Sequence, residues 1–403
     1  MKMLRTHLVI LFLILTFPIL AIPFILREVY FKRYYALNYL AVFMGLLAYL
    51  WIPSGDLYRY YNDFIGMESL SWSSLSDIFR FDFIHPCIMF LISHLGLDFG
   101  FVRLSLSIVC YLLLFSIFKD VIRHSNWLQT NKDCFIAFLT LFFLIRFSGF
   151  LTGVRFTLAM ALSFYGAYWT LHGMSKKGWV CLFLSGFTHF SLWAITFMVI
   201  FIKLVKPSFY KNTTLFLLFF LFLFSPFFLV NIIEVIPVNP MLKLHLENYT
   251  IGYYAGEELQ NHSILFKIAQ ICSIFALYPS VMLLFYRMNK FKNFELFVCL
   301  AIFLVLLWNM NSAYNRYAFL ATIFFILPFF RYGADSFKKS DLYFMFLVSL
   351  FVYSTSILTT KRELINGRQV SIIYMPLPAI LSNTYSSIWI NTNIMPDGDM
   401  RYN

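Results

Sequence analysis

The chain alternates between long apolar runs and short polar segments. Many of the runs approach the length of about 20 residues that a helix needs to cross the hydrocarbon core of a bilayer. The candidate spans are residues 8–26, 34–52, 101–118, 134–150, 154–173, 214–232, 263–286, 294–312, 314–330 and 341–358. Two further apolar stretches, residues 83–97 and 179–202, are ambiguous.

Backbone polar groups find no water inside a bilayer, so spanning segments must be helices or closed barrels, and continuous apolar runs differ from the alternating pattern of barrel strands. The pattern predicts an all-α, polytopic integral membrane protein with about 10–13 transmembrane helices, including re-entrant or half-helices near 83–97 and 179–202. Residues 1–358 are predicted to form a single transmembrane helical domain, and residues 359–403 a polar tail with a half-helix around 371–390. The first run lacks a signal-peptide cleavage site, so we expect it to remain as the first helix.

Short clusters of Lys and Arg separate the runs, and such clusters are typical of cytoplasmic loops. Placing all of them inside leaves four loops outside, near residues 53–82, 146–155, 233–262 and 309–316. The loop 233–262 has four Glu against one Lys, which suits the outer side. The inside clusters are Arg27, Lys32 and Arg33; Lys119, Arg123 and Lys132; Lys176 and Lys177; Lys203, Lys206 and Lys211; Arg287, Lys290 and Lys292; and Arg331, Lys338 and Lys339.

Two stretches interrupt the alternation of sides that this assignment requires. Segment 83–97 is short and contains two His and a Pro, so we expect it to lie at the interface or to dip into the membrane and return. Segment 179–202 lies between two inside clusters and would also re-enter, with a break near Gly186–His189. Non-helical backbone at membrane depth must be buried in protein or line a wet cavity, so this break places His189 in a cavity. The alternative is one ordinary crossing, with a basic cluster on the other side.

The composition narrows the function classes. Hydrophobic residues make up 61% of the chain and charged residues 12%, about half the charged fraction of soluble domains. The net charge of +12 comes largely from the loop clusters, which suits anionic lipid, and no nucleic-acid partner is expected. The six cysteines form no C-x-x-C pair, which gives no support for a metal site or a disulfide framework. Walker A, H-E-x-x-H and G-x-S-x-G motifs are missing from the sequence, so a nucleotide-driven pump or a zinc protease has no support.

Four polar patches are candidates for chemistry, and the first lies in the outer loop 53–82. Asp56 is followed at i+3 by Arg59 and then by Tyr60. An interfacial anchor with a helix-capping ion pair explains these residues without any further function. In the functional interpretation, Asp56 transfers a proton and the aromatic rings stack on sugar.

The second patch is the start of the 154–173 run. Arg155 begins a face of small residues that reaches Gly166 and lets another helix approach closely. A helix N-terminus favours anions, and the Arg fork fits phosphate, so we expect Arg155 to bind an anion. Arg146 lies nearby, and intramembrane arginines are functional candidates. Snorkelling to the lipid headgroups is the alternative for both arginines.

The third patch is His189, whose imidazole suits general acid/base work near neutral pH. A lone His in an apolar stretch is nevertheless more often a hydrogen-bonded structural residue. The fourth patch, residues 309–317, joins two apolar helices and contains three Asn, two Tyr and Arg316. It is either an ordinary wet loop or a site where Arg316 binds phosphate and amides such as Asn315 bind sugar hydroxyls.

The order and spacing of four motifs resemble the EpsG family, which includes polymerases of bacterial surface polysaccharide such as the Wzy-type O-antigen polymerases. The resemblance runs from roughly residue 30 to residue 335, and the tail after residue 359 lies beyond it. The family usually has Gln after the Arg of the second motif, where this chain has Phe156. The motifs are Ser54-Gly55-Asp56-Leu57-Tyr58, Val154-Arg155-Phe156-Thr157-Leu158-Ala159, Phe187-Thr188-His189-Phe190-Ser191 and Asn315-Arg316-Tyr317.

The resemblance implies a glycosyltransferase of the O-antigen polymerase type, active in lipopolysaccharide or related polysaccharide biosynthesis. Such a protein is a multi-pass component of the bacterial inner membrane, surrounded by membrane lipid, with its active site facing the periplasm. Its substrate is an undecaprenyl-pyrophosphate-linked oligosaccharide, and the growing glycan moves from its pyrophosphate to a hydroxyl of the next lipid-linked unit. The resemblance implies no cofactor and no metal. A chain-length regulator and a flippase are its expected partners.

The reaction needs a cationic clamp for the leaving pyrophosphate and a base for the acceptor hydroxyl. The resemblance assigns these roles to the four patches. Pyrophosphate would be bound by Arg155, Arg316 and Arg146, the base would be Asp56 or His189, and the glycan would be positioned by Arg59, Tyr60 and Asn315.

Other functions remain compatible with the sequence. A flippase would move the lipid-linked sugar without forming a glycosidic bond. A transferase that uses a polyprenyl-phosphate sugar more typically has a carboxylate pair in its first outer loop, where Asp56 and Asp63 stand seven residues apart. A structural subunit of an export complex would need no boundary arginines.

Overall fold

The computed structural model describes residues 2–74, 82–145, 154–173, 175–204, 300, 304, 311–332, 337–359, 364, 367–396, 398 and 401. Within these residues the regular elements are helices, without a β-strand, so the all-α prediction is confirmed. The predicted spans 214–232 and 263–286, and nearly all of 294–312, lie outside the described residues.

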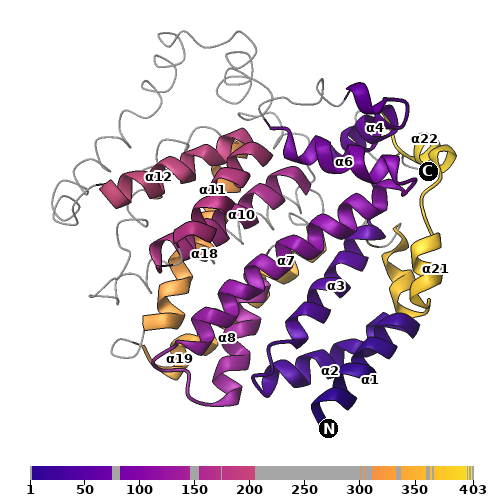
Figure 1. Cartoon of the computed structure of the whole chain (residues 1–403). Coiled ribbons are helices and arrows are strands. Elements are labelled where there is room, and N and C mark those ends of the chain that lie inside the picture. Colours follow the sequence, from indigo (N-terminus) through magenta and orange to yellow (C-terminus); the bar gives the residue numbers. More distant parts are fainter. Residues whose placement is uncertain are drawn as a thin grey trace. The chain divides into compact units, whose positions relative to one another are not determined.

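The chain divides into two compact units. The first comprises Met1–His124, Leu128–Trp193 and Leu342–Asn403, and the second comprises Ser125–Trp127 and Ala194–Asp341. The second unit includes α18 (Asn311–Tyr332) and nearly all of α12 (Trp193–Leu204), while α19 (Lys339–Thr359) lies mostly in the first. The other helices of the first unit, shown in Figure 1, are α1 (Lys2–Thr16), α2 (Pro18–Tyr30), α3 (Ala36–Tyr49), α4 (Asp56–Glu68), η1 (Trp72–Ser74), α6 (Ile84–His94), α7 (Phe99–Arg123), α8 (Asn131–Leu144), α10 (Val154–Leu171), α11 (Ser175–Thr188), η2 (Phe190–Leu192), η5 (Arg368–Ile373), α21 (Leu377–Ser382) and α22 (Ser387–Asn393).

Several predicted spans match observed helices. Two helices in the described part are long and apolar enough to cross a membrane, namely α7 and residues Lys339–Leu358 of α19. They coincide with the predicted spans 101–118 and 341–358. Helices α3, α8 and α10 lie within or close to three further predicted spans. The total of about 10–13 crossings involves segments beyond the described residues and stays a prediction.

The first predicted span, residues 8–26, is wrong as a single helix. The chain forms α1 and α2 instead, and Phe17 between them has a non-helical backbone. Pro18 explains the break, because proline has no N–H to donate and fits the first position of a new helix. The two helices pack against each other and against α3.

Glycines bring the long helices of the first unit close together. A Cβ at Gly166 of α10 would stand 2.8 Å from the carbonyl oxygen of Gly178 in α11. A Cβ at Gly45 of α3 would stand 2.5 Å from the side chain of Ile108 in α7. Small residues permit such close approach between membrane helices. The close packing predicted for the small-residue face of α10 is therefore confirmed at Gly166.

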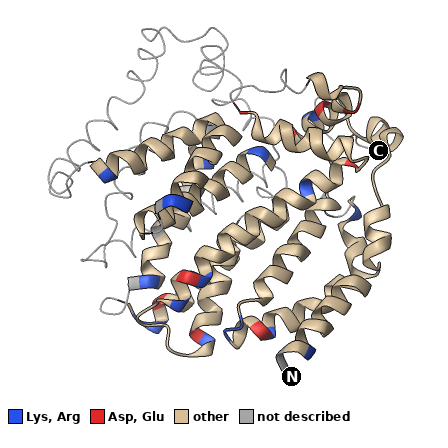
Figure 2. Ribbon diagram, viewed as in Figure 1, with Lys and Arg blue, Asp and Glu red and all other residues tan. Residues whose placement is uncertain are grey.

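The first unit has two chemically different ends. At one end, Lys32 donates to the carbonyl oxygen of Gln129 at 3.2 Å, and the guanidinium of Arg123 lies over the ring of Tyr34 at 5.1 Å. Two of the predicted inside clusters thus meet there. At the other end, α7 and α10 begin and α3 finishes. Figure 2 shows no charged residue anywhere in α3, and charges near the two ends of α7.

The two irregular stretches of the sequence differ from ordinary spans. Helix α6 has 11 residues, about 16 Å at the usual rise, which is half the thickness of a bilayer core. In the second stretch α11 ends at Thr188 and His189 is extended, with φ −151° and ψ 115°. The predicted break near Gly186–His189 is therefore present, and whether the chain re-enters stays a prediction.

The tail belongs to the first unit and packs against the end of α3. Tyr49 donates to the carbonyl oxygen of Leu381 at 2.6 Å, and Tyr385 donates to that of Leu50 at 3.2 Å. The predicted single half-helix around 371–390 is replaced by the three short helices η5, α21 and α22. Prolines at the start of α21 and an N-capping Ser386 at α22 set these boundaries. The predicted domain boundary at residue 358 stays a prediction.

Candidate functional site

Arg155 is the second residue of α10 and forms an ion pair with a carboxylate far away in the sequence. Its Nη1 donates to Oδ2 of Asp82 at 2.6 Å, and the two side chains are 26% and 22% exposed. The Nε of Arg155 is buried and has no hydrogen-bond partner among the described residues. The guanidinium therefore binds one oxygen although its geometry allows two parallel bonds.

Tyr60 of α4 lies beneath this guanidinium. The Arg155 Cζ is 5.8 Å from the centroid of the Tyr60 ring, and the Arg59 Cζ is 5.2 Å from the same centroid. Tyr60 is only 8% exposed. Arg59 pairs with Asp56 at 3.5 Å, and more than half of each side chain is exposed. Such an exposed ion pair by itself contributes little stability.

His85 lies in the first turn of α6 and also contacts Tyr60. Its ring meets Tyr60 edge-on, with 5.0 Å between the centroids. The side chain is 1% exposed, and its Nε2 has no hydrogen-bond partner among the described residues. Sequence reasoning noted His85 only as a sign that segment 83–97 does not span the membrane.

His189 also comes close to the start of α10. Its ring meets Phe156 edge-on at 5.3 Å, and its Nδ1 is 2.8 Å from the hydroxyl of Ser191. Phe187, near the end of α11, contacts Phe83 just before α6. Three elements thus converge on the first turn of α10. We call the residues that meet there the α10 cluster: Tyr60, Asp82, His85, Arg155, Phe156 and His189.

The structure does not bring every predicted residue into this cluster. Arg146 lies outside the described residues. Asn315 and Arg316 belong to α18 in the second unit. Residues 309–317 were predicted as a polar junction between two apolar spans, the second of which starts at residue 314. The part before residue 314 is wrong as a loop, because α18 already begins at Asn311. Polar residues are no obstacle to the first turns of a helix, where backbone N–H groups need partners. Arg316 is half-buried, and its participation with Arg155 stays a prediction.

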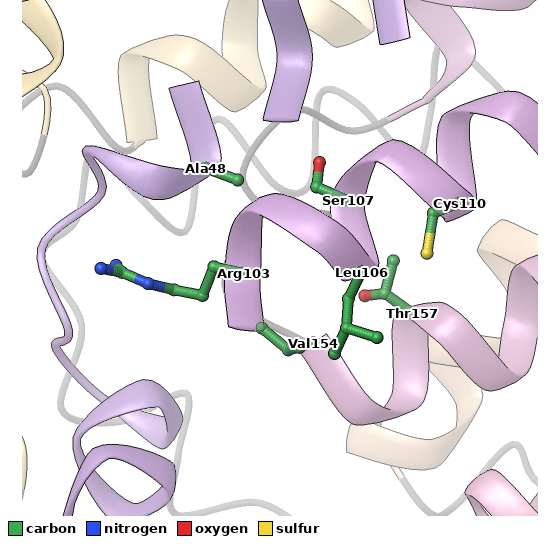
Figure 3. A pocket seen from close by; sticks show the side chains of 7 residues that line it. All are labelled: Ala48, Arg103, Leu106, Ser107, Cys110, Val154 and Thr157. Atoms are coloured by element: carbon green, nitrogen blue, oxygen red, sulfur yellow. The ribbon is translucent and has the colours of Figure 1, made fainter. Parts of the chain in front are cut away.

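Arg103 of α7 is a buried cation that sequence reasoning missed. It is 4% exposed and donates to the carbonyl oxygens of Tyr49, at 3.0 Å, and of Trp51. These carbonyls lie at or just after the end of α3, where the helix dipole favours a positive charge. In Figure 3 its side chain extends away from a small cavity between α3, α7 and α10. The cavity measures about 10 Å³, room for one water molecule.

These contacts give Arg103 a structural role in tying α3 to α7. Its position inside the predicted span 101–118 was the available signal, because an arginine within a span needs a partner. For metals, no group of three His, Cys, Asp or Glu side chains in the described part of the chain is arranged to hold an ion.

A family model described as the EpsG family matches residues 37–370, which is most of the chain and includes the α10 cluster and α18. The chain belongs to the EpsG family. No curated protein and no solved structure matches it. Membership makes this EpsG protein a membrane protein of the glycosyltransferase-like polymerases of polysaccharide repeat units. The resemblance noted in the sequence is thereby confirmed.

Proposed function

We propose that this EpsG protein polymerises lipid-linked oligosaccharide repeat units of O-antigen or a similar surface polysaccharide. The growing glycan would be transferred from undecaprenyl pyrophosphate to a hydroxyl of the next lipid-linked unit, on the periplasmic side of the bacterial inner membrane. The observation that supports this reaction best is the single-carboxylate pairing of Arg155 at the start of α10.

Arg155 fits the leaving group by charge and geometry. Its guanidinium is a quarter exposed and can be reached, and it stands at a helix N-terminus that also favours anions. A pyrophosphate carries more negative charge than the single carboxylate of Asp82, and its oxygens can accept two parallel bonds from Nη1 and Nη2 of the guanidinium. Exchange of Asp82 for a phosphoryl group is therefore favourable. The developing charge on the leaving oxygen is then stabilised by a fixed cation.

The remaining predicted residues are assigned supporting roles. Arg59 and Asp56 are exposed at the start of α4 and suit contacts to glycan hydroxyls. Tyr60 is nearly buried, so we assign it the support of the Arg59 and Arg155 guanidiniums rather than stacking on sugar. Arg316 and Arg146 would add cations for the pyrophosphate, and Asn315 a glycan contact. A chain-length regulator and a flippase would act beside the polymerase.

Deletion of the gene in its host tests the reaction class. A polymerase predicts surface glycan capped with single repeat units on a gel. Loss of all surface glycan would favour a flippase or an earlier transferase, and a normal ladder would contradict both.

Complementation of the deletion strain tests the site. Arg155→Ala should remove the ladder while the protein still inserts, because the leaving pyrophosphate loses its clamp. Arg123→Ala is the matched control, since Arg123 is exposed at the opposite end of the first unit. A wild-type ladder with Arg155→Ala would refute the role of Arg155.

A further inference from the structure

His85 stands apart from the other histidines in the described residues. Each of the others has a hydrogen-bond partner for a ring nitrogen, whereas Nε2 of His85 is buried without one. Leaving a buried polar atom without a partner is destabilising. Such atoms are rare in native proteins and call for an explanation.

The position of His85 suggests a reason for its unpartnered nitrogen. His85 and Arg155 both contact the Tyr60 ring, at 5.0 and 5.8 Å from its centroid, so the imidazole and the guanidinium stand at most about 11 Å apart. In a direct displacement the attacking and leaving oxygens lie on opposite sides of the anomeric carbon. Groups that serve the two oxygens must then be separated by the width of the reacting centre. In inverting glycoside hydrolysis the two carboxyl groups stand about 6.5–9.5 Å apart.

We propose that His85 is the general base of the transfer, an inference that rests on the proposed function. Nε2 of neutral His85 accepts the proton of the acceptor hydroxyl while the acceptor oxygen bonds to the anomeric carbon. The bond from that carbon to the phosphate oxygen breaks, and its electron pair stays on the pyrophosphate held by Arg155. The imidazolium afterwards gives its proton to water, which restores neutral His85.

The other two candidates for the base are less suitable. Asp56 is more than half exposed and pairs with Arg59. His189 contacts Phe156, whereas His85 and Arg155 both contact the Tyr60 ring.

The ion pair of Arg155 involves the turn that directly precedes His85. Asp82 lies three residues before His85, in the turn that leads into α6, and it is the carboxylate that pyrophosphate replaces on Arg155. Exchange of Asp82 for pyrophosphate removes this bond between α10 and the turn in front of α6. In the proposed reaction the acceptor hydroxyl reaches Nε2 in this donor-bound state.

The test uses the full chain in lipid nanodiscs and two measurements. Inorganic pyrophosphate reports the anion clamp by its dissociation constant. Lipid-linked repeat units extracted from the deletion strain report turnover. His85→Gln should lower turnover by about 10²–10⁴-fold, the usual contribution of a general base, while the pyrophosphate dissociation constant stays within about threefold of wild type.

His124→Gln is the matched control, because His124 is 60% exposed and lies at the opposite end of the first unit. It should leave both measurements unchanged. His85→Phe serves as a second variant that fills the same buried space with an apolar ring. It should fold and bind pyrophosphate but lack turnover.

Near-wild-type turnover in His85→Gln would overturn the proposal. So would a parallel loss of turnover and pyrophosphate binding, or failure of both His85 variants to fold, since each assigns His85 to packing. A different result would contradict the proposed function itself. If the wild-type protein forms no polymer from the lipid-linked units, the function itself fails. If wild type polymerises and Arg155→Ala does not, yet His85→Gln behaves as wild type, only the assignment of His85 fails.

Discussion

Asp82 and Arg155 lie 73 residues apart in the chain and meet through one hydrogen bond. Arg155 was recognisable from the sequence because an arginine at the start of an apolar helix is conspicuous. Asp82 and His85 were not, since their importance comes from contacts with α4 and α10 rather than from local pattern. Tyr60 was recognised, but its burial beneath two guanidiniums depends on the same long-range contacts. At the scale of the residue, the sequence identified the arginine proposed to bind the anion but not the residues that surround it.

Replacing Asp82 by Asn should strengthen pyrophosphate binding. The wild-type carboxylate competes for Arg155, and the neutral amide competes less, so we expect a dissociation constant about tenfold lower, equivalent to about 1.4 kcal/mol. Titration of the protein in nanodiscs with pyrophosphate measures this change. Asp63→Asn removes the same charge from an exposed position of α4 and is the control. Weaker binding in Asp82→Asn would mean that Asp82 only holds Arg155 in place.

At the scale of the element, apolar periodicity predicted the long helices well. Helices α7, α10 and α19 follow their predicted spans because each is a continuous apolar run with clear polar ends. The pattern failed where one backbone group decides the outcome, as at Pro18 between α1 and α2. It also failed at residues 311–313, where polar side chains suggested a loop although α18 begins at Asn311.

The contact between α10 and α11 should be sensitive to a single methyl group. In Gly166→Ala the new Cβ would lie 2.8 Å from a backbone carbonyl oxygen that cannot rotate away. Overpacking of this kind costs about 1–3 kcal/mol, so the melting temperature of the purified protein should fall. Gly66→Ala in α4 is the control, because a Cβ there meets nothing within 4 Å. Equal melting temperatures for the two variants would contradict the close approach.

The junction of α2 and α3 should make stability depend on pH. Burial alone would raise the pKa of Glu28, but hydrogen bonds from Tyr35 at 2.6 Å and Arg33 at 2.9 Å hold it below its ordinary value. A carboxyl with a lowered pKa in the folded state stabilises the protein above its ordinary pKa and loses that effect as the pH falls.

The melting temperature of wild type should therefore fall as the pH drops below about 4.5, the ordinary pKa of the group. In Glu28→Gln it should be lower at pH 7 and should change less over this range. Glu68→Gln, at an exposed position of α4, should keep the wild-type profile. Parallel profiles for wild type and Glu28→Gln would show that the junction contributes nothing.

At the scale of the whole molecule, the two ends of the first unit should face opposite sides of the membrane. The α10 cluster lies at one end and the basic residues near Arg123 lie at the other. A cysteine introduced at Asp63, in a background without native cysteines, should react with a membrane-impermeant maleimide in intact cells. A cysteine at His124 should react only after permeabilisation. The reverse result would contradict the periplasmic site, and labelling of both from one side would contradict the two-ended arrangement.

If Arg155 and Arg316 bind the same pyrophosphate, as proposed, substitutions at the two positions should be energetically coupled. Residues that share a ligand give non-additive effects, with coupling energies of about 0.5–3 kcal/mol, whereas distant and independent sites add within about 0.5 kcal/mol. We therefore expect Arg155→Lys and Arg316→Lys to be coupled in their effects on the pyrophosphate dissociation constant. The same cycle with Arg155→Lys and Arg123→Ala should be additive, because Arg123 lies at the far end of the first unit. Additivity for the Arg155 and Arg316 pair would assign Arg316 to a separate role and leave the α10 cluster as the complete clamp.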